Sequence, residues 1–236
     1  MLILKIETTF QGVIPRTPSI TSFRFPRPAE LEYKAGQYFF VTLRHQGKEL
    51  THHFTYSSSP TEKSHIEFTK RLSDSEYSDA LRAAKAGDWV RIDGPYGNFT
   101  FDGEYPKIAL LAGGIGITPF ISMCKNATDK ALSSRIVLFF ACRSPSDIPF
   151  REEFQEIARK NSNLKVNFTV TEATPDWTGL IGNIDTDMVK KQLPDYADYV
   201  FYACGPPPMV KAMQALVEEL GLSKDRLKLE FFTGYT

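Results

Sequence analysis

A cluster of glycines stands where an apolar run gives way to a helical pattern. The run is Leu110-Leu-Ala-Gly-Gly-Ile-Gly-Ile-Thr-Pro119, and its glycines are Gly113, Gly114 and Gly116. Glycine lets a backbone approach a phosphate closely, and the free amides at the start of a helix stabilise negative charge. Thr118 fits the helix N-cap and Pro119 fits the first helical position. The pattern predicts a dinucleotide phosphate loop, although a tight turn without a ligand would need the same glycines.

A second glycine-bearing loop follows a later apolar strand, in the run Tyr202-Ala-Cys-Gly-Pro-Pro-Pro-Met209. Open parallel sheets bind their ligands beyond the carboxyl ends of the strands. The two loops can therefore line one crevice, and the second loop adds further candidate contacts. These are Cys204, Gly205, Pro206 and Met209.

Neither the cysteines nor the histidines form a metal-binding pattern. Cys124, Cys142 and Cys204 are an odd number at wide spacing, which suits reduced thiols, and they fall short of the four thiolates of a plant-type iron-sulfur cluster. His52 and His53 are neighbours on a predicted strand and project to opposite faces, with no accompanying carboxylate or thiolate pattern. We therefore expect neither a metal site nor an iron-sulfur cluster held by this chain alone.

Composition and charge are those of an ordinary globular enzyme. In the 236 residues, hydrophobic side chains make up 42% and charged side chains 24%, and 28 basic residues balance 28 acidic ones. Without a basic excess, binding to nucleic acid or to an anionic membrane surface is disfavoured. The most apolar stretch, residues 108–117, is too short to span a bilayer, and the first residues lack the layout of a secretory signal. We expect a cytoplasmic protein.

The first hundred residues contain short extended runs, many of them rich in aromatic and β-branched side chains, separated by proline and glycine. The runs are 2–9, 20–25, 37–43, 52–56, 65–70 and 89–93. This pattern predicts a closed or nearly closed antiparallel β-barrel. One helix is expected at about 76–84, where Ser73 and Glu76 could form a capping box.

Beyond residue 106 the pattern changes to apolar strands separated by helical stretches. The strands are expected at 108–112, 136–141, 165–171, 199–203 and 227–232. Alternating strands and helices predict an α/β domain, a parallel sheet with helices on both faces. The segment Gly94-Pro-Tyr-Gly-Asn-Phe99 separates the two patterns, so we expect one domain at 1–101 and a second at 102–236.

These motifs and their order resemble the ferredoxin-NADP reductase superfamily over essentially the whole chain. The superfamily's nicotinamide domain carries a Gly-Gly-x-Gly-x-x-Pro loop and a late Cys-Gly-Pro motif, and both are present here in order. Further matching pieces are Trp177-Thr-Gly-Leu-Ile-Gly182 and residues 143–150. The resemblance implies a flavin-binding β-barrel followed by an NAD(P)-binding α/β domain, with a C-terminal aromatic tail near the flavin.

The activity that the resemblance implies is that of an NAD(P)H-dependent flavoprotein reductase. Its flavin is expected to be FAD rather than FMN, with hydride supplied by NADPH or NADH and electrons passed to a separate acceptor. The acceptor would be an iron-sulfur protein, a haem protein or a partner subunit. Two alternatives stay open: a stand-alone reductase of small molecules such as quinones or ferric chelates, and a cofactor-binding redox sensor or regulatory subunit.

The resemblance also implies a flavin site. The superfamily's Arg-x-Tyr-Ser/Thr strand motif corresponds to residues 52–55, where Phe54 would stack on the isoalloxazine ring and Thr55 would lie near its N5 atom. His52 replaces the arginine and shares a strand face with Phe54, but it cannot supply a permanent bidentate charge. The strand end Thr69-Lys-Arg71 is a candidate for the missing charge. The implied flavin-binding set is His52, Phe54, Thr55, Tyr56, Ser57, Thr69, Lys70, Ser75, Tyr77, Ser78, Phe232 and Tyr235.

Two of these groups have particular implied roles. Residues 74–78 would hold the flavin diphosphate through backbone amides at a helix start. A terminal aromatic that follows a glutamate would cover the outer flavin face, and Phe232 after Glu230 fits this pattern best, with Tyr235 as the runner-up.

At the nicotinamide, the resemblance implies the catalytic residues Thr55, Cys204 and Glu230. Cys204 would pack against or polarise the nicotinamide ring, and Glu230 would orient Cys204 or pass protons. Arg143 and Ser144 follow the second strand of this domain, where relatives often meet the 2′-phosphate, which favours NADPH over NADH. The implied coenzyme-binding set is Gly113, Gly114, Gly116, Thr118, Pro119, Arg143, Ser144, Cys204, Gly205, Pro206 and Met209.

Overall fold

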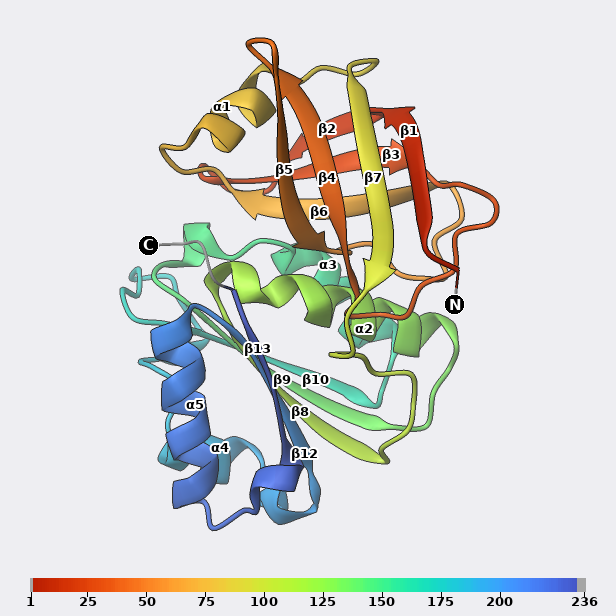
Figure 1. The fold of residues 1–236 in the computed structure, drawn as a ribbon. Coiled ribbons are helices and arrows are strands. Elements are labelled where there is room, and N and C mark those ends of the chain that lie inside the picture. The colour runs from red at the N-terminus through yellow and green to blue at the C-terminus, as the bar shows by residue number, and fades with distance from the viewer. Residues whose placement is uncertain (1, 233–236) are drawn as a thin grey trace.

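Two antiparallel sheets form the first part of the chain in the computed structural model, which describes residues 2–232. One sheet has the strand order β1-β7-β4-β5, and the other has the order β2-β3-β6. The strands of the first are β1 (Leu4–Thr9), β7 (Trp89–Tyr96), β4 (Tyr38–His45) and β5 (Lys48–Thr55), and those of the second are β2 (Gly12–Pro15), β3 (Ile20–Pro26) and β6 (His65–Arg71). The two sheets pack together as the barrel in the upper half of Figure 1.

Aromatic rings fill the interior of this barrel. Phe23, Phe25, Phe39 and Phe68 are fully buried, and the rings of Phe23 and Phe68 stack with their centroids 5.1 Å apart. Because side chains alternate between the two faces of a strand, aromatic positions on one face meet inside while polar positions on the other face stay at the surface. The predicted barrel-like antiparallel fold is confirmed, and β2 is an additional strand that the sequence analysis did not predict.

Helix α1 (Glu76–Ala83) packs against β4 and β5. Its N-cap is Ser75, whose side-chain oxygen accepts a hydrogen bond from the Ser78 amide at 3.2 Å. The capping box predicted for Ser73 and Glu76 is therefore wrong, because the chain is already extended at Ser75 and the helix begins one residue later. Tyr77 anchors the helix through its hydroxyl, which donates to the Val41 carbonyl at 2.9 Å.

A six-stranded parallel sheet with the order β11-β10-β9-β8-β12-β13 forms the second part of the chain. Its strands are β8 (Lys107–Gly113), β9 (Arg135–Cys142), β10 (Leu164–Val170), β11 (Leu180–Ile181), β12 (Val200–Gly205) and β13 (Leu227–Phe231). All five predicted strands are present. β11 is a short additional strand that lies within the Trp177–Gly182 motif and pairs with β10.

Helices cover both faces of this sheet, as the sequence predicted. The longer helices are α2 (Thr118–Asp129), α3 (Arg151–Lys160), α4 (Thr186–Gln192) and α5 (Pro207–Glu219), and the 3-10 turns are η1 (Gly114–Ile117), η2 (Pro145–Asp147), η3 (Tyr196–Asp198) and η4 (Lys224–Arg226). On β8, Leu110 packs with the residues of α2 and α3, whereas Leu111 packs with those of α4 and α5. Figure 1 shows α2 between the sheet and the barrel.

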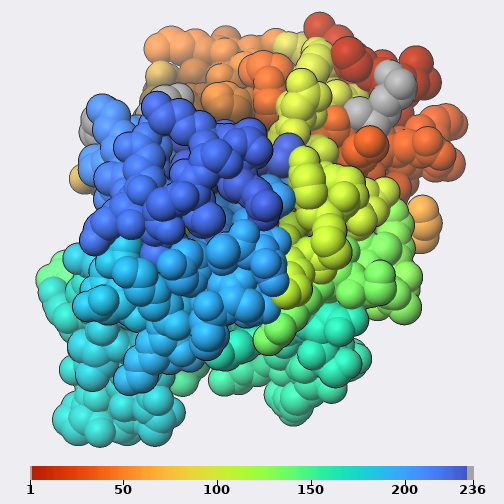
Figure 2. All heavy atoms as spheres, turned by 90° about the horizontal axis from the view of Figure 1, so that it is seen from below, coloured from red at the N-terminus to blue at the C-terminus, as the bar shows by residue number. Residues whose placement is uncertain are grey.

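The barrel rests on α2 and on the segment that joins the two sheets. Gly36 has a φ of +98°, and a Cβ built there would lie 2.1 Å from the carbonyl oxygen of Phe99, so this close approach requires glycine. Viewed from below, the yellow-green joining segment runs down the face, between the blue residues of the second domain and the red, orange and green residues beside it (Figure 2). β7 ends at Tyr96 and β8 begins at Lys107. The boundary placed between residues 101 and 102 stays a prediction.

Within residues 2–232, no helix is both long and apolar enough to cross a membrane.

Candidate functional site

The two predicted glycine loops meet at one edge of the parallel sheet. β8 and β12 are hydrogen-bonded neighbours with Ala112 opposite Cys204, so the loops that follow them leave the sheet together. A Cβ built on Gly116 would lie 2.2 Å from the carbonyl oxygen of Cys204. No side chain fits at that distance, which is why the loop requires glycine at this position.

Met209 fills the space between the two loops. A Cβ on Gly113 would lie 3.0 Å from Met209 Cγ, and a Cβ on Gly205 would lie 3.1 Å from Met209 Sδ. Gly114 differs, because its φ is +52° and a Cβ there would meet only Arg71 Nη2, at 3.8 Å. The backbone of Gly114 therefore borders open space, and the loop forms a cradle that a ligand can approach.

The helix that starts at this loop has no side-chain cap. η1 begins after Gly113, and α2 follows with Ile117 as its N-cap, and neither residue supplies a side-chain hydrogen bond. The predicted N-cap role of Thr118 is wrong, because the 3-10 turn places Thr118 inside the helix, where its Oγ1 donates to the Ile115 carbonyl at 3.3 Å. Pro119 lies in the first turn, as predicted. The uncapped amides of this helix start can bind an anion.

A cavity of about 490 Å³ borders the loops. The predicted coenzyme contacts that line it are Gly113, Gly114, Arg143, Pro206 and Met209. The lining residues that the sequence analysis did not assign to the coenzyme are Arg71, Ala141, Cys142, Asp147, Thr171 and Asn183. Several of these lie at or just beyond the carboxyl ends of β9 and β10, which follow β8 in the sheet order. Knowing this order would have pointed to them as cavity residues.

The remaining predicted coenzyme contacts lie behind this lining. Gly116, Thr118, Pro119, Cys204 and Gly205 are buried. Ser144 hydrogen-bonds to Asp147 Oδ2 at 2.8 Å and thereby holds a residue that does line the cavity. Their contacts with a coenzyme stay predictions.

Arg71 reaches the cavity from the barrel. It is the last residue of β6, its Nη1 donates to Ser19 Oγ at 2.8 Å, and its Nη2 lies near Gly114. From the sequence, Arg71 is a candidate source of charge for the flavin phosphate. The structure turns the guanidinium toward the glycine loop of the other domain instead, where it can pair with a second phosphate group.

Cys204 and Glu230 are opposite each other on neighbouring strands β12 and β13. The Sγ of Cys204 donates to Glu230 Oε2 at 3.9 Å, and Cys204 is fully buried. Burial, together with the nearby Glu230, raises the pKa of the Cys204 thiol well above its ordinary value. Burial also raises the pKa of Glu230 to about 7, although the hydrogen bond from Cys204 partly opposes this rise. Glu230 can therefore gain or lose a proton near neutral pH, whereas the Cys204 thiol stays protonated there.

His52, Phe54 and Tyr77 form an aromatic group at the other side of the barrel. The His52 ring lies 4.3 Å from that of Tyr77, and Phe54 stacks on Phe68 with the centroids also 4.3 Å apart. Burial and then the charge of Lys70 lower the pKa of His52, so its imidazole is mostly neutral at pH 7. Lys70 is largely buried, and its Nζ donates to the Arg71 carbonyl at 3.0 Å, so its compensating role toward a flavin phosphate stays a prediction.

The other predicted flavin contacts on β5 and β6 are largely buried. Thr55 ends β5 and is 5% exposed, and the ring of Tyr56 stacks between Tyr33 and Phe39. The hydroxyl of Ser57 hydrogen-bonds to that of Thr69 at 2.8 Å. Side chains of Tyr56, Ser57 and Thr69 thus serve the barrel interior, and their role toward a flavin stays a prediction.

Helix α1 presents a backbone start to the same region. Ser75 and Ser78 hydrogen-bond through their hydroxyls at 2.9 Å, and Ser75 caps the Ser78 amide. The amides of Glu76 and Tyr77 are in the first turn, where no carbonyl of the helix can accept from them, so they can bind a phosphate.

The final described residues return to the glycine loops. The amide of Phe232 donates to the Gly205 carbonyl at 3.1 Å, and the Phe232 side chain packs against the core of the parallel-sheet domain. The runner-up, Tyr235, lies outside the described residues.

Comparisons with known proteins agree with this geometry. The family model of the oxidoreductase FAD-binding domain matches residues 7–101, and that of the oxidoreductase NAD-binding domain matches residues 110–215. NADH-cytochrome b5 reductase 1 of Aspergillus oryzae is 30% identical over 225 residues, which are 90% of this chain and 77% of that protein. The reductase component of propane 2-monooxygenase from Rhodococcus jostii is 29% identical over 239 residues, which are 97% of this chain and 64% of that protein.

A solved structure shares the whole fold. The cytochrome b5 reductase domain of Ulva prolifera nitrate reductase superimposes with a TM-score of 0.85 at 25% identity, covering 97% of both chains. The resemblance read from the motifs, the enzymatic nature of the protein and its use of FAD and a nicotinamide coenzyme are thereby confirmed. With its FAD-binding barrel, its NAD-binding sheet and its two glycine loops at one edge, this chain belongs to the ferredoxin-NADP reductase superfamily of flavin-dependent oxidoreductases.

Proposed function

We propose that this protein takes electrons from a nicotinamide coenzyme through FAD and delivers them to a separate redox protein. The observation that carries the proposal is the whole-chain similarity to reductases named for protein acceptors, a cytochrome b5 reductase and the reductase component of an oxygenase. Within residues 2–232, no group of three or more His, Cys, Asp or Glu side chains could hold a metal ion. By analogy with these relatives, the redox centre that receives the electrons is proposed to belong to an iron-sulfur protein, a haem protein or a partner subunit.

The residues at both ends of the site fit the two cofactors. The glycine cradle and the uncapped helix start suit a pyrophosphate, and Arg71 adds a positive charge beside Gly114. On the barrel, Lys70 and the first amides of α1 suit the phosphates of FAD. Bound FAD supplies the chemistry, since it accepts a hydride and can release electrons singly or in pairs.

The chain's own contribution is to bind and align. Arg71 and the loop amides would hold the coenzyme phosphates, and Thr55 would offer a hydroxyl beside the flavin. Cys204 would pack at the nicotinamide end. Glu230 would hold Cys204 in place through their hydrogen bond and would keep or release a proton near pH 7, because burial has raised its pKa to about 7.

For the coenzyme, we propose NADH ahead of NADPH, although the sequence pattern at Arg143 and Ser144 favoured NADPH. The Nε of Arg143 donates to Glu172 Oε1 at 2.8 Å, so one N–H of the guanidinium is already bound to a carboxylate. The charge of Glu172 opposes a 2′-phosphate at this position. The curated relative with 30% identity is also named for NADH.

The proposal is tested with the purified FAD-loaded protein under anaerobic conditions. NADH should bleach the flavin absorption, and the reduced protein should then reduce cytochrome b5 or a plant-type ferredoxin in preference to small acceptors. Acceptor preference is compared as kcat/KM for each protein against a quinone and a ferric chelate. If the small acceptors are reduced more efficiently than every redox protein tried, the stand-alone reductase is the correct alternative. A flavin that NADH and NADPH both fail to bleach would leave the sensor alternative.

A further inference from the structure

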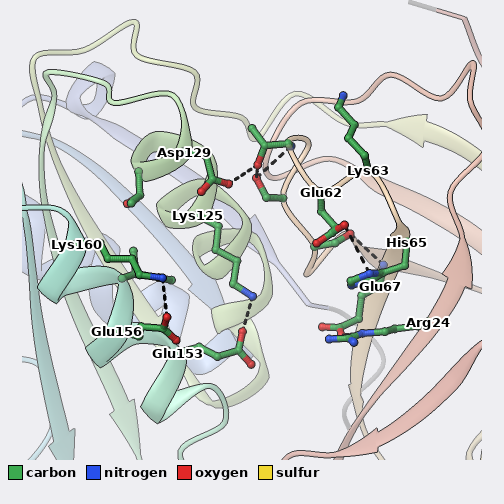
Figure 3. Close-up of a pocket in the computed structure, with 15 residues that line it drawn as sticks. Arg24, Glu62, Lys63, His65, Glu67, Lys125, Asp129, Glu153, Glu156 and Lys160 are labelled. Atoms are coloured by element: carbon green, nitrogen blue, oxygen red, sulfur yellow. Dashed lines mark hydrogen bonds and ion pairs between the residues drawn. The ribbon is translucent and has the colours of Figure 1, made fainter.

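A charged interface joins the two domains away from the coenzyme cavity. It surrounds a second cavity of about 680 Å³, which shares no lining residue with the coenzyme cavity. In Figure 3, Lys125 and Glu153 on α2 and α3 face Arg24 and Glu67 on the barrel strands β3 and β6. Nothing in the function described so far uses these charges.

Arg16 crosses this interface. It follows β2, its side chain is only 13% exposed, and its Nη2 pairs with Glu67 Oε2 at 3.1 Å. Its Nη1 pairs with Glu153 of α3, and its guanidinium lies 4.6 Å from the ring centroid of Phe150. A single arginine thus binds one carboxylate from each domain, and its rigid planar fork fixes the direction of both contacts more closely than a flexible lysine ammonium would.

On the barrel side, Glu67 connects Arg16 to the segment 55–57, at and just after the end of β5. Glu67 is 2% exposed, and its Oε1 accepts a hydrogen bond from Ser57 Oγ at 3.0 Å. The Ser57 amide also donates to the Glu67 carbonyl at 2.8 Å. Ser57 stands two residues after Thr55, so Glu67 fixes the segment that is proposed to lie beside the flavin.

On the other side, Glu153 and Phe150 tie Arg16 to a loop of the coenzyme cavity. Phe150 caps α3 in the left-handed region, with a φ of +59°, and it lies three residues after Asp147, which lines the cavity. Glu153 is in the first turn of α3 and also pairs with Lys125 of α2. Burial alone would raise the pKa of Glu153. The charges of Lys125 and Arg16 outweigh burial and hold this pKa below its ordinary value.

We infer that Arg16 is a positioning residue for hydride transfer, because it fixes the distance between the segment 55–57, which is proposed to lie beside the flavin, and the coenzyme domain. Hydride transfer depends steeply on the separation of the reacting atoms, and a misplacement of about 1 Å can cost about a hundredfold in rate. The contacts of Arg16 are largely shielded from water, so they resist screening by salt. The inference rests on the proposed flavin site at Thr55 and does not depend on the identity of the electron acceptor.

Arg24 offers a matched control. It pairs with the same Glu67, Nε to Oε2 at 2.8 Å, but the two residues stand opposite each other on β3 and β6 of the barrel. Loss of Arg24 removes a cation from Glu67 without removing an arginine that bridges to Glu153 and Phe150. Arg16→Met and Arg24→Met therefore separate the bridge from the general effect of weakening Glu67.

The experiment is single-turnover flavin reduction by saturating NADH, with FAD bound and without any acceptor. Arg16→Met should slow bleaching about tenfold and change the isotope effect measured with NADH deuterated at C4, while the coenzyme dissociation constant changes less than the rate. Arg24→Met should stay within about twofold of the wild type. Arg16→Lys keeps the positive charge but lacks the rigid planar fork, so its rate of flavin reduction should fall between those of the wild type and Arg16→Met.

A second variant keeps the test decisive if Arg16→Met does not fold. Glu153→Gln keeps the shape of the side chain and removes the far partner, so it should slow the same step, and its effect should not add to that of Arg16→Met in the double variant. Equal rates in both arginine variants, or a lower Tm with unchanged reduction in Arg16→Met and Glu153→Gln, overturn the inference. If the wild-type flavin itself is not reduced, the proposed function fails rather than the role of Arg16 alone.

Discussion

The ring of His52 lies 4.3 Å from that of Tyr77, centroid to centroid. The family resemblance implies an arginine for the flavin phosphate at the position of His52. Burial and the charge of Lys70 lower the pKa of this imidazole, so it carries little charge at neutral pH. That Lys70 of the adjacent strand β6 supplies the positive charge for the flavin phosphate stays a prediction.

His52→Arg should tighten FAD binding. A guanidinium at this position adds a charge-assisted hydrogen bond to a phosphate, worth roughly 1.5 kcal/mol or about tenfold in Kd. Titration of the apoprotein with FAD, followed by flavin fluorescence, measures the effect. His53→Arg, on the opposite strand face, is the control and should leave the Kd unchanged. An unchanged Kd in His52→Arg would mean that Lys70 already meets the phosphate.

Glu230 should impose a pH dependence on hydride transfer. Its pKa is raised to about 7 by burial, so the carboxylate forms as pH rises through neutrality. A carboxylate stabilises the positive charge that develops on a nicotinamide ring during hydride loss, so the rate should increase from pH 6 to pH 8. Stopped-flow reduction of the flavin across this range should show the inflection in the wild type, and Glu230→Gln should give a flat profile. An identical inflection in the variant would assign it to another group.

The same group should make stability fall with rising pH. A carboxyl whose folded pKa exceeds its ordinary value of 4.5 binds more protons in the folded state than in the unfolded state between those two values. Its contribution is fully present below about pH 4.5 and is lost as pH rises through about 7, a change on the order of 3 kcal/mol. Glu230→Gln should therefore gain stability relative to the wild type at pH 8 compared with pH 5, as measured by urea unfolding.

Arg143 and Glu172 should set the choice of coenzyme. Glu172→Gln removes the charge that competes for Arg143, and kcat/KM for NADPH should rise several-fold while that for NADH changes little. The ion pair is exposed and therefore weak, so a shift of more than about tenfold is not expected. Arg143→Ala should lower kcat/KM for NADPH selectively. Equal losses for both coenzymes would remove Arg143 from the specificity role.

Phe232 should control access of the nicotinamide to the flavin. Its amide is held by Gly205, beside Cys204, so its ring stands close to the loop that would receive the nicotinamide. Phe232→Ala should tighten apparent coenzyme binding, because a competing ring is removed, and should slow turnover if product leaves less easily. Coenzyme titration and steady-state kinetics measure these two effects.

The matching variant Tyr235→Ala serves as the comparison for Phe232→Ala. If only Tyr235→Ala changes coenzyme affinity and the rate of flavin reduction, the covering ring is Tyr235. If both variants alter the Tm and nothing else, the terminal aromatics serve only to complete the fold.

The sequence by itself determined the fold class and the two nucleotide loops. The run of Gly113, Gly114 and Gly116 between an apolar stretch and a proline marks a strand-to-helix turn in the sequence alone, although the 2.2 Å approach that excludes a side chain at Gly116 is made to Cys204 of a distant strand. The alternation of aromatic residues in the first hundred positions and the strand-helix alternation that follows are local patterns as well. Local patterns of this kind are set by steric and solvent contacts of near neighbours, which a linear reading captures.

The tertiary structure alone decided which distant side chains meet. Arg71 stands in a run offered for the flavin phosphate, yet the packing of the two domains carries its guanidinium to Gly114. Arg16 shows the same dependence, because Glu67 and Glu153 reach it from different domains. The N-cap of α2 is Ile117 rather than the predicted Thr118, because a 3-10 turn precedes the helix. The contacts of Arg71 and Arg16 depend on strand order and on the docking of two domains, and residue spacing along the chain does not encode either of them.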